Sequence, residues 1–92
     1  MTSTTQPLAG RVALVTGAGR NIGRAIALML AEDGAAVVVN ARSNKAEADA
    51  VAAEIAARGG QAISVIADIA DAAAVDRMVA AAAARFGRID IL

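Results

Sequence analysis

Four short apolar runs alternate along the chain with longer stretches in which apolar residues recur at helical spacing. The runs occupy residues 12–16, 35–40, 62–67 and 89–92, and each contains valine or isoleucine. Because the first two runs are nearly unbroken by polar residues, they predict strands buried on both faces, as in a parallel sheet covered by helices. The pattern therefore predicts the element order β-α-β-α-β-α-β.

The stretch after the first run predicts a helix. Ile22, Ile26, Met29 and Leu30 fall on one face of it, and we expect this face to be its apolar side. We expect this helix to end at Gly34, because glycine readily adopts the left-handed conformation that ends many helices.

The next two helical stretches carry start signals as well as apolar faces. Asn44 and Asp71 are placed to cap their first turns. Val51 and Ile55 mark the apolar side of the second helix. The stripe of the third helix comprises Val75, Met78, Val79, Ala82 and Phe86.

Right-handed crossovers between parallel strands determine how such a chain folds. They predict an α/β fold, the N-terminal half of a doubly wound parallel sheet of the Rossmann type, with strand order 3-2-1-4. We assign residues 8–92 to this partial domain, which reaches only the start of the fourth strand, and residues 1–7 to a flexible polar tail. The order reverses between the first and fourth strands, where such sheets bind ligands.

A glycine-rich turn lies between the first strand and the first helix, at that same place. Gly17, Gly19 and Gly23 are spaced G-x-G-x-x-x-G, unlike the G-x-G-x-x-G of the common dinucleotide fingerprint. One interpretation is a tight connection in which Gly23 lets the helix pack closely on the strand. The strand-turn-helix context favours a nucleotide site, because the first amides of a helix lack partners within it and its dipole attracts phosphate.

Composition excludes several classes of function. The 92 residues have a formal net charge of zero and scattered basic residues, so we expect neither nucleic-acid nor membrane binding. The absence of cysteine and histidine removes disulfides and the usual zinc ligand sets, and we expect no metal site. Without a signal-like N-terminus or a long apolar run, we expect a cytoplasmic protein.

The glycine turn resembles a motif of the short-chain dehydrogenases/reductases. Residues 16–23, Thr-Gly-Ala-Gly-Arg-Asn-Ile-Gly, are similar to the family's T-G-x-x-x-G-x-G. Asp68-Ile69 and residues 86–92 match further family segments in order and spacing, so the resemblance covers residues 8–92. It is strongest to the 3-oxoacyl-acyl-carrier-protein reductases, and it implies the cofactor-binding half of an NAD(P)-dependent oxidoreductase.

The resemblance implies that the turn binds the cofactor pyrophosphate. The family's middle glycine is replaced by Asn21, which tolerates a left-handed backbone better than other non-glycine residues. The implied cofactor-binding residues of the turn are Gly17, Gly19, Arg20, Asn21, Ile22 and Gly23.

The end of the second strand bears on which nicotinamide cofactor is bound. NAD-preferring members carry an acid that accepts a hydrogen bond from the ribose, and the matching position is Ala41. Arg42 follows, and together with Arg20 it is suited to a 2′-phosphate, with Ser43 and Lys45 in reach. We therefore favour NADP(H), with NAD(H) possible; the alternative is that Arg42 and Lys45 are solvated loop charges.

Asp68 and Ile69 follow the third strand. The resemblance implies that they border the adenine, with the carboxylate accepting from its amine. The alternative is that Asp68 caps the turn that follows it.

The family's catalytic Tyr-x-x-x-Lys pair has no counterpart here, because the chain contains no tyrosine. We assign no catalytic residue and expect the 92-residue chain by itself to be inactive. The resemblance implies a full-length homo-oligomeric enzyme that reduces a small-molecule carbonyl or oxidises an alcohol. The alternative is a non-catalytic nucleotide-binding or regulatory module.

Two other nucleotide-binding folds are disfavoured. A methyltransferase-like fold is disfavoured by the missing acid after the second strand, and a P-loop by the missing Gly-Lys-Ser/Thr in the turn.

Overall fold

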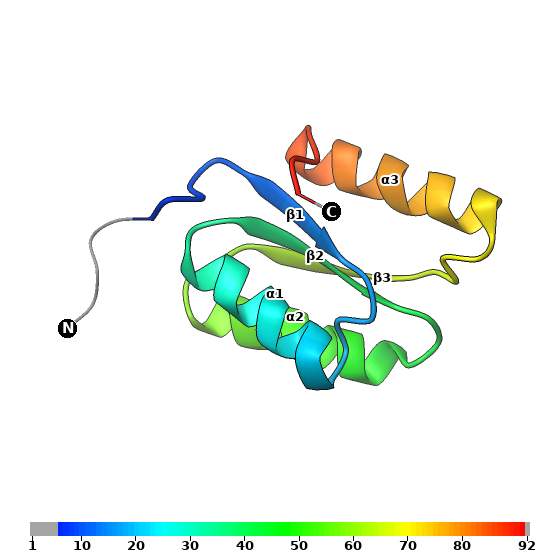
Figure 1. The fold of residues 1–92 in the computed structure, drawn as a ribbon, viewed down its shortest axis with the longest axis horizontal. Helices are drawn as coiled ribbons and strands as arrows, with labels where there is room; N and C mark the ends of the chain where they lie inside the picture. The colour runs from blue at the N-terminus through cyan, green and yellow to red at the C-terminus, as the bar shows by residue number, and fades with distance from the viewer. Residues whose placement is uncertain (1–5, 92) are drawn as a thin grey trace.

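A parallel sheet lies between helices in the computed structural model, which describes residues 6–91 (Figure 1). The predicted element order is confirmed as far as α3. The elements are β1 (Val12–Val15), α1 (Asn21–Glu32), β2 (Ala36–Ala41), α2 (Lys45–Ala57), β3 (Ala62–Ile66) and α3 (Ala72–Phe86).

The strands are hydrogen-bonded in the order β1-β2-β3, all parallel. On the free edge of β1, Ile91 forms a parallel bridge with Ala13, and the amide of Leu14 donates to the Ile91 carbonyl at 2.8 Å. The start of the fourth strand therefore lies beside β1, which confirms the predicted order 3-2-1-4. Of the predicted fourth strand, residue 92 lies outside the described residues.

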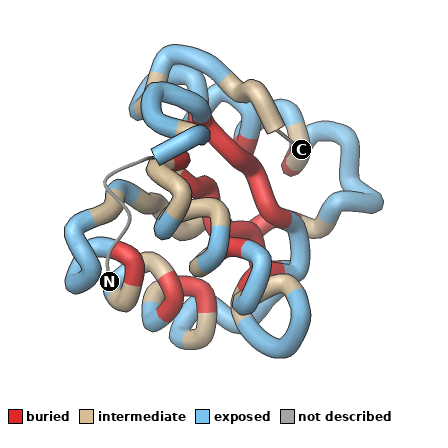
Figure 2. Tube along the Cα trace, turned by 60° about the vertical axis from the view of Figure 1, so that its left-hand side comes forward, coloured by how far each residue is buried: buried red, intermediate tan, exposed pale blue. Residues whose placement is uncertain are grey.

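Two apolar layers hold the helices on the sheet, with α1 and α2 on one face and α3 on the other (Figures 1 and 2). Alternate residues of β2 serve each layer, because successive strand side chains point to opposite faces. Val37 and Val39 pack with Val51 and Ile55 of α2, whereas Val38 packs towards α3. All four residues of β1 are buried, as the unbroken apolar run predicted.

The predicted helix signals are confirmed. The side chain of Asn44 accepts from the amide of Glu47 at 3.0 Å, and Asp71 accepts from two amides in the first turn of α3. Gly34 ends the first helical segment at φ +105°. The caps lie at the predicted residues because they depend on local hydrogen bonds.

The predicted apolar face of α1 is wrong in part. Ile22, Ile26 and Met29 are 76%, 43% and 61% exposed, whereas Ala27 is completely buried. Gly23 lies against the glycine turn, so the side of α1 that faces the protein begins with this residue and continues through Ala27. Leu30 is half-buried beside the core, as expected.

The predicted tail, residues 1–7, lies mostly outside the described residues. Gln6 and Pro7 are exposed. The amide of Leu8 donates to the carbonyl of Asp33, directly after α1, at 2.9 Å.

Candidate nucleotide-binding site

The glycine turn leaves β1 at Val15 and enters α1 at Asn21. It needs left-handed backbone at two places, Gly17 with φ +62° and Asn21 with φ +56°. Asn21 is the sole non-glycine residue with positive φ among residues 6–91. Asparagine pays a smaller steric cost for this conformation than most side chains, so the turn forms without the glycine that the family motif carries there.

Gly23 lies against the turn itself. A Cβ at this position would be 2.1 Å from the carbonyl oxygen of Gly17 and 3.1 Å from the Cα of Ala18. No side chain fits at such distances. The need for glycine therefore comes from the contact between the helix and the turn backbone, rather than from helix-to-strand packing as the sequence interpretation had it.

Further contacts fix the turn to the second strand and helix. The amide of the buried Ala18 donates to the Asn40 carbonyl at 2.8 Å. A Cβ at Gly19 would lie 3.2 Å from the Glu47 Cβ and 3.7 Å from the Ala41 Cβ. Ala41 is 7% exposed and forms part of the core next to Gly19. The turn is thus held by β2 and α2 as well as by its own chain.

The first turn of α1 is open to an anion. Its N-cap, Arg20, makes no side-chain capping hydrogen bond, and the first turn holds no acidic residue, whereas α2 and α3 have side-chain caps. Nothing lies within 4 Å of the place where a Cβ on Gly17 would be. The space above the turn and the N-terminal end of the helix dipole therefore fit a phosphate group.

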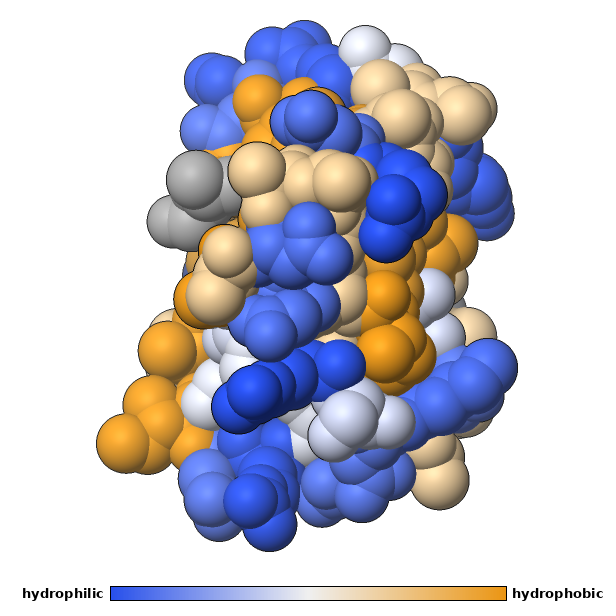
Figure 3. Space-filling model, turned by 90° about the vertical axis from the view of Figure 1, so that its right-hand side faces the viewer, coloured by the Kyte–Doolittle hydropathy of each residue, from blue (hydrophilic) through white to orange (hydrophobic). Residues whose placement is uncertain are grey.

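A cavity of about 270 Å³ lies at the carboxyl edge of the strands, the end that faces the viewer in Figure 3. Its lining comes from the ends of all three strands: Thr16, Gly17, Asn40, Arg42, Ala67, Asp68 and Ile69. In Figure 3 this end of the molecule is largely hydrophilic, with smaller apolar areas between the polar side chains.

The structure brings four of the predicted site residues together around this cavity: Gly17, Arg42, Asp68 and Ile69. Seven others do not line it: Gly19, Arg20, Asn21, Ile22, Gly23, Ala41 and Ser43. Six of the seven lie in the glycine turn, at the start of α1 or at or just after the end of β2. Of these, Arg20 and Ser43 are exposed to solvent. Ile22 points into solvent at 76% exposure.

Arg42 and Asp68 form an ion pair at the cavity. Nε of Arg42 lies 3.6 Å from Oδ2 of Asp68, and the side chains are 82% and 42% exposed. Oδ1 of Asp68 accepts a hydrogen bond from the amide of Ala70 at 2.9 Å. The alternative interpretation, that Asp68 caps the following turn, is therefore confirmed. Lys45 pairs instead with Asp49, at 2.6 Å.

Asn40 is a site residue that the sequence interpretation missed. Its side chain is 2% exposed, and its Nδ2 donates to the carbonyls of Val65 at 3.1 Å and Ala67 at 3.2 Å. With its own carbonyl bound to Ala18, it connects the glycine turn to the loop after β3. The available signal was a single amide side chain at the end of an otherwise apolar strand.

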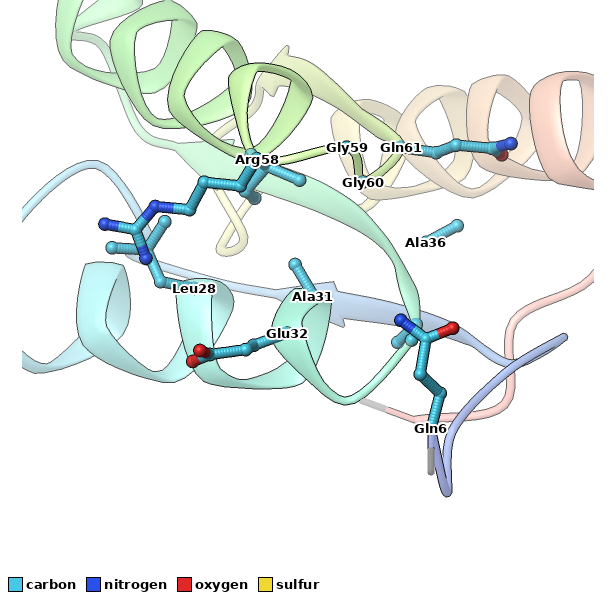
Figure 4. A pocket seen from close by; sticks show the side chains of 12 residues that line it. Gln6, Leu28, Ala31, Glu32, Ala36, Arg58, Gly59, Gly60 and Gln61 are labelled. Atoms are coloured by element: carbon cyan, nitrogen blue, oxygen red, sulfur yellow. The ribbon is translucent and has the colours of Figure 1, made fainter. Parts of the chain in front are cut away.

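A larger cavity, of about 660 Å³, lies at the opposite end of the sheet, between the ends of α1 and α2 (Figure 4). Glu32 and Arg58 are among its charged residues, and Arg58 pairs with Glu54 at 2.8 Å. The glycine turn does not line this cavity. Its position places it away from the crevice where doubly wound sheets bind ligands.

Two carboxyl groups have shifted pKa values, and both lie outside the cavity at the strand ends. A hydrogen bond from Lys45, reinforced by Ser64, lowers the pKa of Asp49. A hydrogen bond from Arg88, together with the amide of Val12, lowers the pKa of Asp90. Residues 6–91 contain no group of three acidic, cysteine or histidine residues that could hold a metal ion.

The fold and the site together define the class: part of a doubly wound α/β domain with a glycine turn at the switch in strand order. The chain belongs to the short-chain dehydrogenase family, whose model matches residues 11–92. Within the described residues, no helix has the length and apolar character required to cross a bilayer.

Individual relatives match at high identity. An uncharacterised oxidoreductase of Methylorubrum extorquens is 56% identical over 85 residues, covering 92% of this chain and 34% of the relative. A 3-oxoacyl-[acyl-carrier-protein] reductase of Synechocystis sp. is 52% identical over 85 residues, with the same coverage. Among solved structures, a metagenomic short-chain oxidoreductase crystallised in complex with NADP is 44% identical in sequence. It superposes with a TM-score of 0.85, and the match covers 92% of this chain and 38% of that one. The chain spans about a third of the length of the curated relatives it matches.

Proposed function

We propose that this chain binds NADP(H) and forms the cofactor-binding part of an enzyme that transfers hydride to a carbonyl or from an alcohol. The observation that carries the proposal is the glycine turn, whose Gly23 admits no Cβ while the space beside Gly17 is open above an uncapped helix start. A related short-chain oxidoreductase of known structure, 44% identical, was crystallised in complex with NADP.

Each part of the dinucleotide has a proposed place. The turn from Gly17 to Gly23 and the first amides of α1 would hold the pyrophosphate. Asp68 and Ile69 would border the adenine. Arg42 would bind the 2′-phosphate, because guanidinium groups suit phosphate oxygens and Ala41 offers no carboxylate to a ribose hydroxyl. Arg20 and Ser43, both exposed, would assist.

The bound nicotinamide would supply or accept the hydride, and this chain would hold and orient the cofactor. We assign it no catalytic residue, and expect no turnover from the 92 residues alone. In the full-length protein we propose a small-molecule carbonyl or alcohol substrate, a homo-oligomer and a cytoplasmic location. Binding of the adenine half is therefore the property to test.

The test is a calorimetric titration of the 92-residue chain with 2′,5′-ADP and with 5′-ADP, two probes that differ by the 2′-phosphate. We expect 2′,5′-ADP to bind more tightly. Arg42→Ala should weaken it by about 10-fold or more, the effect of losing a hydrogen bond to a charged group, and leave 5′-ADP almost unchanged.

Arg58→Ala is the matched control, because Arg58 is also exposed and ion-paired but lies at the opposite end of the sheet. It should alter neither affinity. Equal losses for both probes in Arg42→Ala, or a wild type that prefers 5′-ADP, would contradict the preference for NADP(H). A wild type that binds neither probe would contradict the nucleotide site.

A further inference from the structure

The parallel register of β2 and β3 determines which charges meet at the site. Ala41 pairs with Ile66, and the amide of Ala67 donates to the Ala41 carbonyl at 3.0 Å. The segments that follow β2 and β3 therefore leave the sheet side by side. They bring Arg42 and Asp68 to one cavity, with Nε and Oδ2 3.6 Å apart.

The two members of this ion pair differ in freedom. Asp68 is fixed, because its Oδ1 accepts from the amide of Ala70 at 2.9 Å and the preceding Ala67 carbonyl is held by Asn40. Arg42 is 82% exposed. Among the described residues, Asp68 is its one ion-pair partner. The fixed carboxylate thus lies beside Nε of the guanidinium that a ligand phosphate would require.

We propose that Asp68 is a specificity-determining residue that acts through Arg42. Its carboxylate competes with the 2′-phosphate of the ligand for the Arg42 guanidinium and so reduces the preference for NADP(H). This inference rests on the proposed function, since it concerns the same nucleotide site. A phosphate bound to Arg42 would share the guanidinium with this carboxylate, and two anions beside one cation weaken its attraction for each. A nucleotide without the 2′-phosphate leaves the ion pair in place and meets no such competition.

The size of the effect follows from the exposure of the pair. Exposed ion pairs are worth up to about 1 kcal/mol, which corresponds to about a fivefold change in affinity. Removing the Asp68 charge should therefore raise the ratio of 2′,5′-ADP affinity to 5′-ADP affinity by about 2- to 5-fold.

Asp68→Asn is the variant of choice, because an asparagine Oδ1 still accepts from the Ala70 amide and preserves the turn. Asp71→Asn is its matched control. Asp71 lies three residues further along the same loop, the substitution removes the same charge, and asparagine caps α3 equally well. Circular dichroism melting curves of both variants establish that each is folded.

The measurement is calorimetric titration of wild type and both variants with 2′,5′-ADP and 5′-ADP. We expect Asp68→Asn to raise the ratio of 2′,5′-ADP affinity to 5′-ADP affinity by about 2- to 5-fold, since any change in the adenine contact affects both probes and cancels in the ratio. Asp71→Asn should leave the ratio of the two affinities at the wild-type value. In an Arg42→Ala background, Asp68→Asn should no longer raise that ratio.

Several results would overturn the inference while leaving the proposed function in place. They are an unchanged or lowered ratio in Asp68→Asn, the same gain in Asp71→Asn, or an undiminished gain in the Arg42→Ala background. If wild type binds neither probe, the proposed function and this inference fail together.

Discussion

Gly23 shows how one missing methyl group determines the site. The carbonyl oxygen of Gly17 would lie 2.1 Å from a Cβ there, and the obstacle is backbone rather than a flexible side chain. The smallest substitution, Gly23→Ala, must therefore displace either the helix start or the turn. We expect a loss of about 2–3 kcal/mol in the free energy of unfolding, the cost of forced overpacking, and loss of nucleotide binding.

Urea unfolding and titration with 2′,5′-ADP measure these two effects. Gly19→Ala is the comparison, because the nearest atom to its Cβ would be the Glu47 Cβ at 3.2 Å, a contact that a small shift relieves. It should cost clearly less stability. Equal losses in the two variants would mean that the Gly17 contact is not the reason for glycine at position 23.

Asn21 permits the opposite test. Its φ of +56° is left-handed, a conformation that glycine adopts without steric cost. Asn21→Gly should therefore leave the free energy of unfolding within about 1 kcal/mol of wild type and preserve nucleotide binding. Loss of binding in a stable Asn21→Gly protein, measured by the same titration, would show that the asparagine side chain is itself a ligand.

Among the elements, β1 and the residues before the fourth strand are joined by Asp90. Its Oδ2 accepts from the Val12 amide at 2.9 Å, and its Oδ1 accepts from Nε of Arg88 at 2.9 Å. These hydrogen bonds favour the ionised carboxylate, so they hold the pKa of Asp90 below its ordinary value of 3.8. The charge of Asp90 therefore links two chain segments far apart in the sequence.

The pH dependence follows from the sign of this shift. A carboxyl group with a lowered pKa in the folded state stabilises the fold above its unfolded pKa, and this contribution is lost as the pH falls through the folded value. Asp90→Asn should accordingly be less stable than wild type at pH 7. The difference should shrink as the pH falls below the ordinary value of 3.8 towards the lower pKa of the folded wild type, where the Asp90 carboxylate becomes protonated.

Urea midpoints of the two proteins from pH 7 to pH 2 provide the measurement. Asp49 also has a lowered pKa, but it is present in both proteins, so it cancels in the difference. A stability difference that does not change with pH would show that the contribution of Asp90 does not depend on its charge.

At the scale of the whole molecule, the 92-residue chain exposes apolar side chains on the outer side of α1. Ile22, Ile26 and Met29 are 76%, 43% and 61% exposed and lie on one helical face. Such a surface favours association. We expect the isolated chain to self-associate, and the double variant Ile26→Gln with Met29→Gln to raise the dissociation constant by about 10-fold, as loss of roughly 1.5 kcal/mol of apolar burial implies.

Sedimentation velocity over a concentration series measures this change. Val79→Gln is the control, because Val79 is 41% exposed on α3 at the other face of the sheet. It should leave the dissociation constant unchanged. A monomeric wild type, or an equal effect of Val79→Gln, would contradict association through α1.

The sequence by itself determined those features that depend on near neighbours in the chain. The buried strands β1 and β2 followed from unbroken apolar runs, and the caps at Asn44 and Asp71 from hydrogen bonds within one turn. The parallel order followed from the handedness of the crossovers, which leaves few topologies for a β-α-β chain. The glycine turn was likewise recognisable, because its spacing and its place between strand and helix are local properties.

Only the tertiary structure decided the features that depend on the register of distant segments. The side of α1 that is buried is set by the contact of Gly23 with the turn, a distance that hydrophobic periodicity does not encode. Asn40 became a site residue because its amide reaches the carbonyls at the end of β3. The pairing of Arg42 with Asp68 needs β2 and β3 in register, so the sequence showed two charges in separate loops and the fold made them partners.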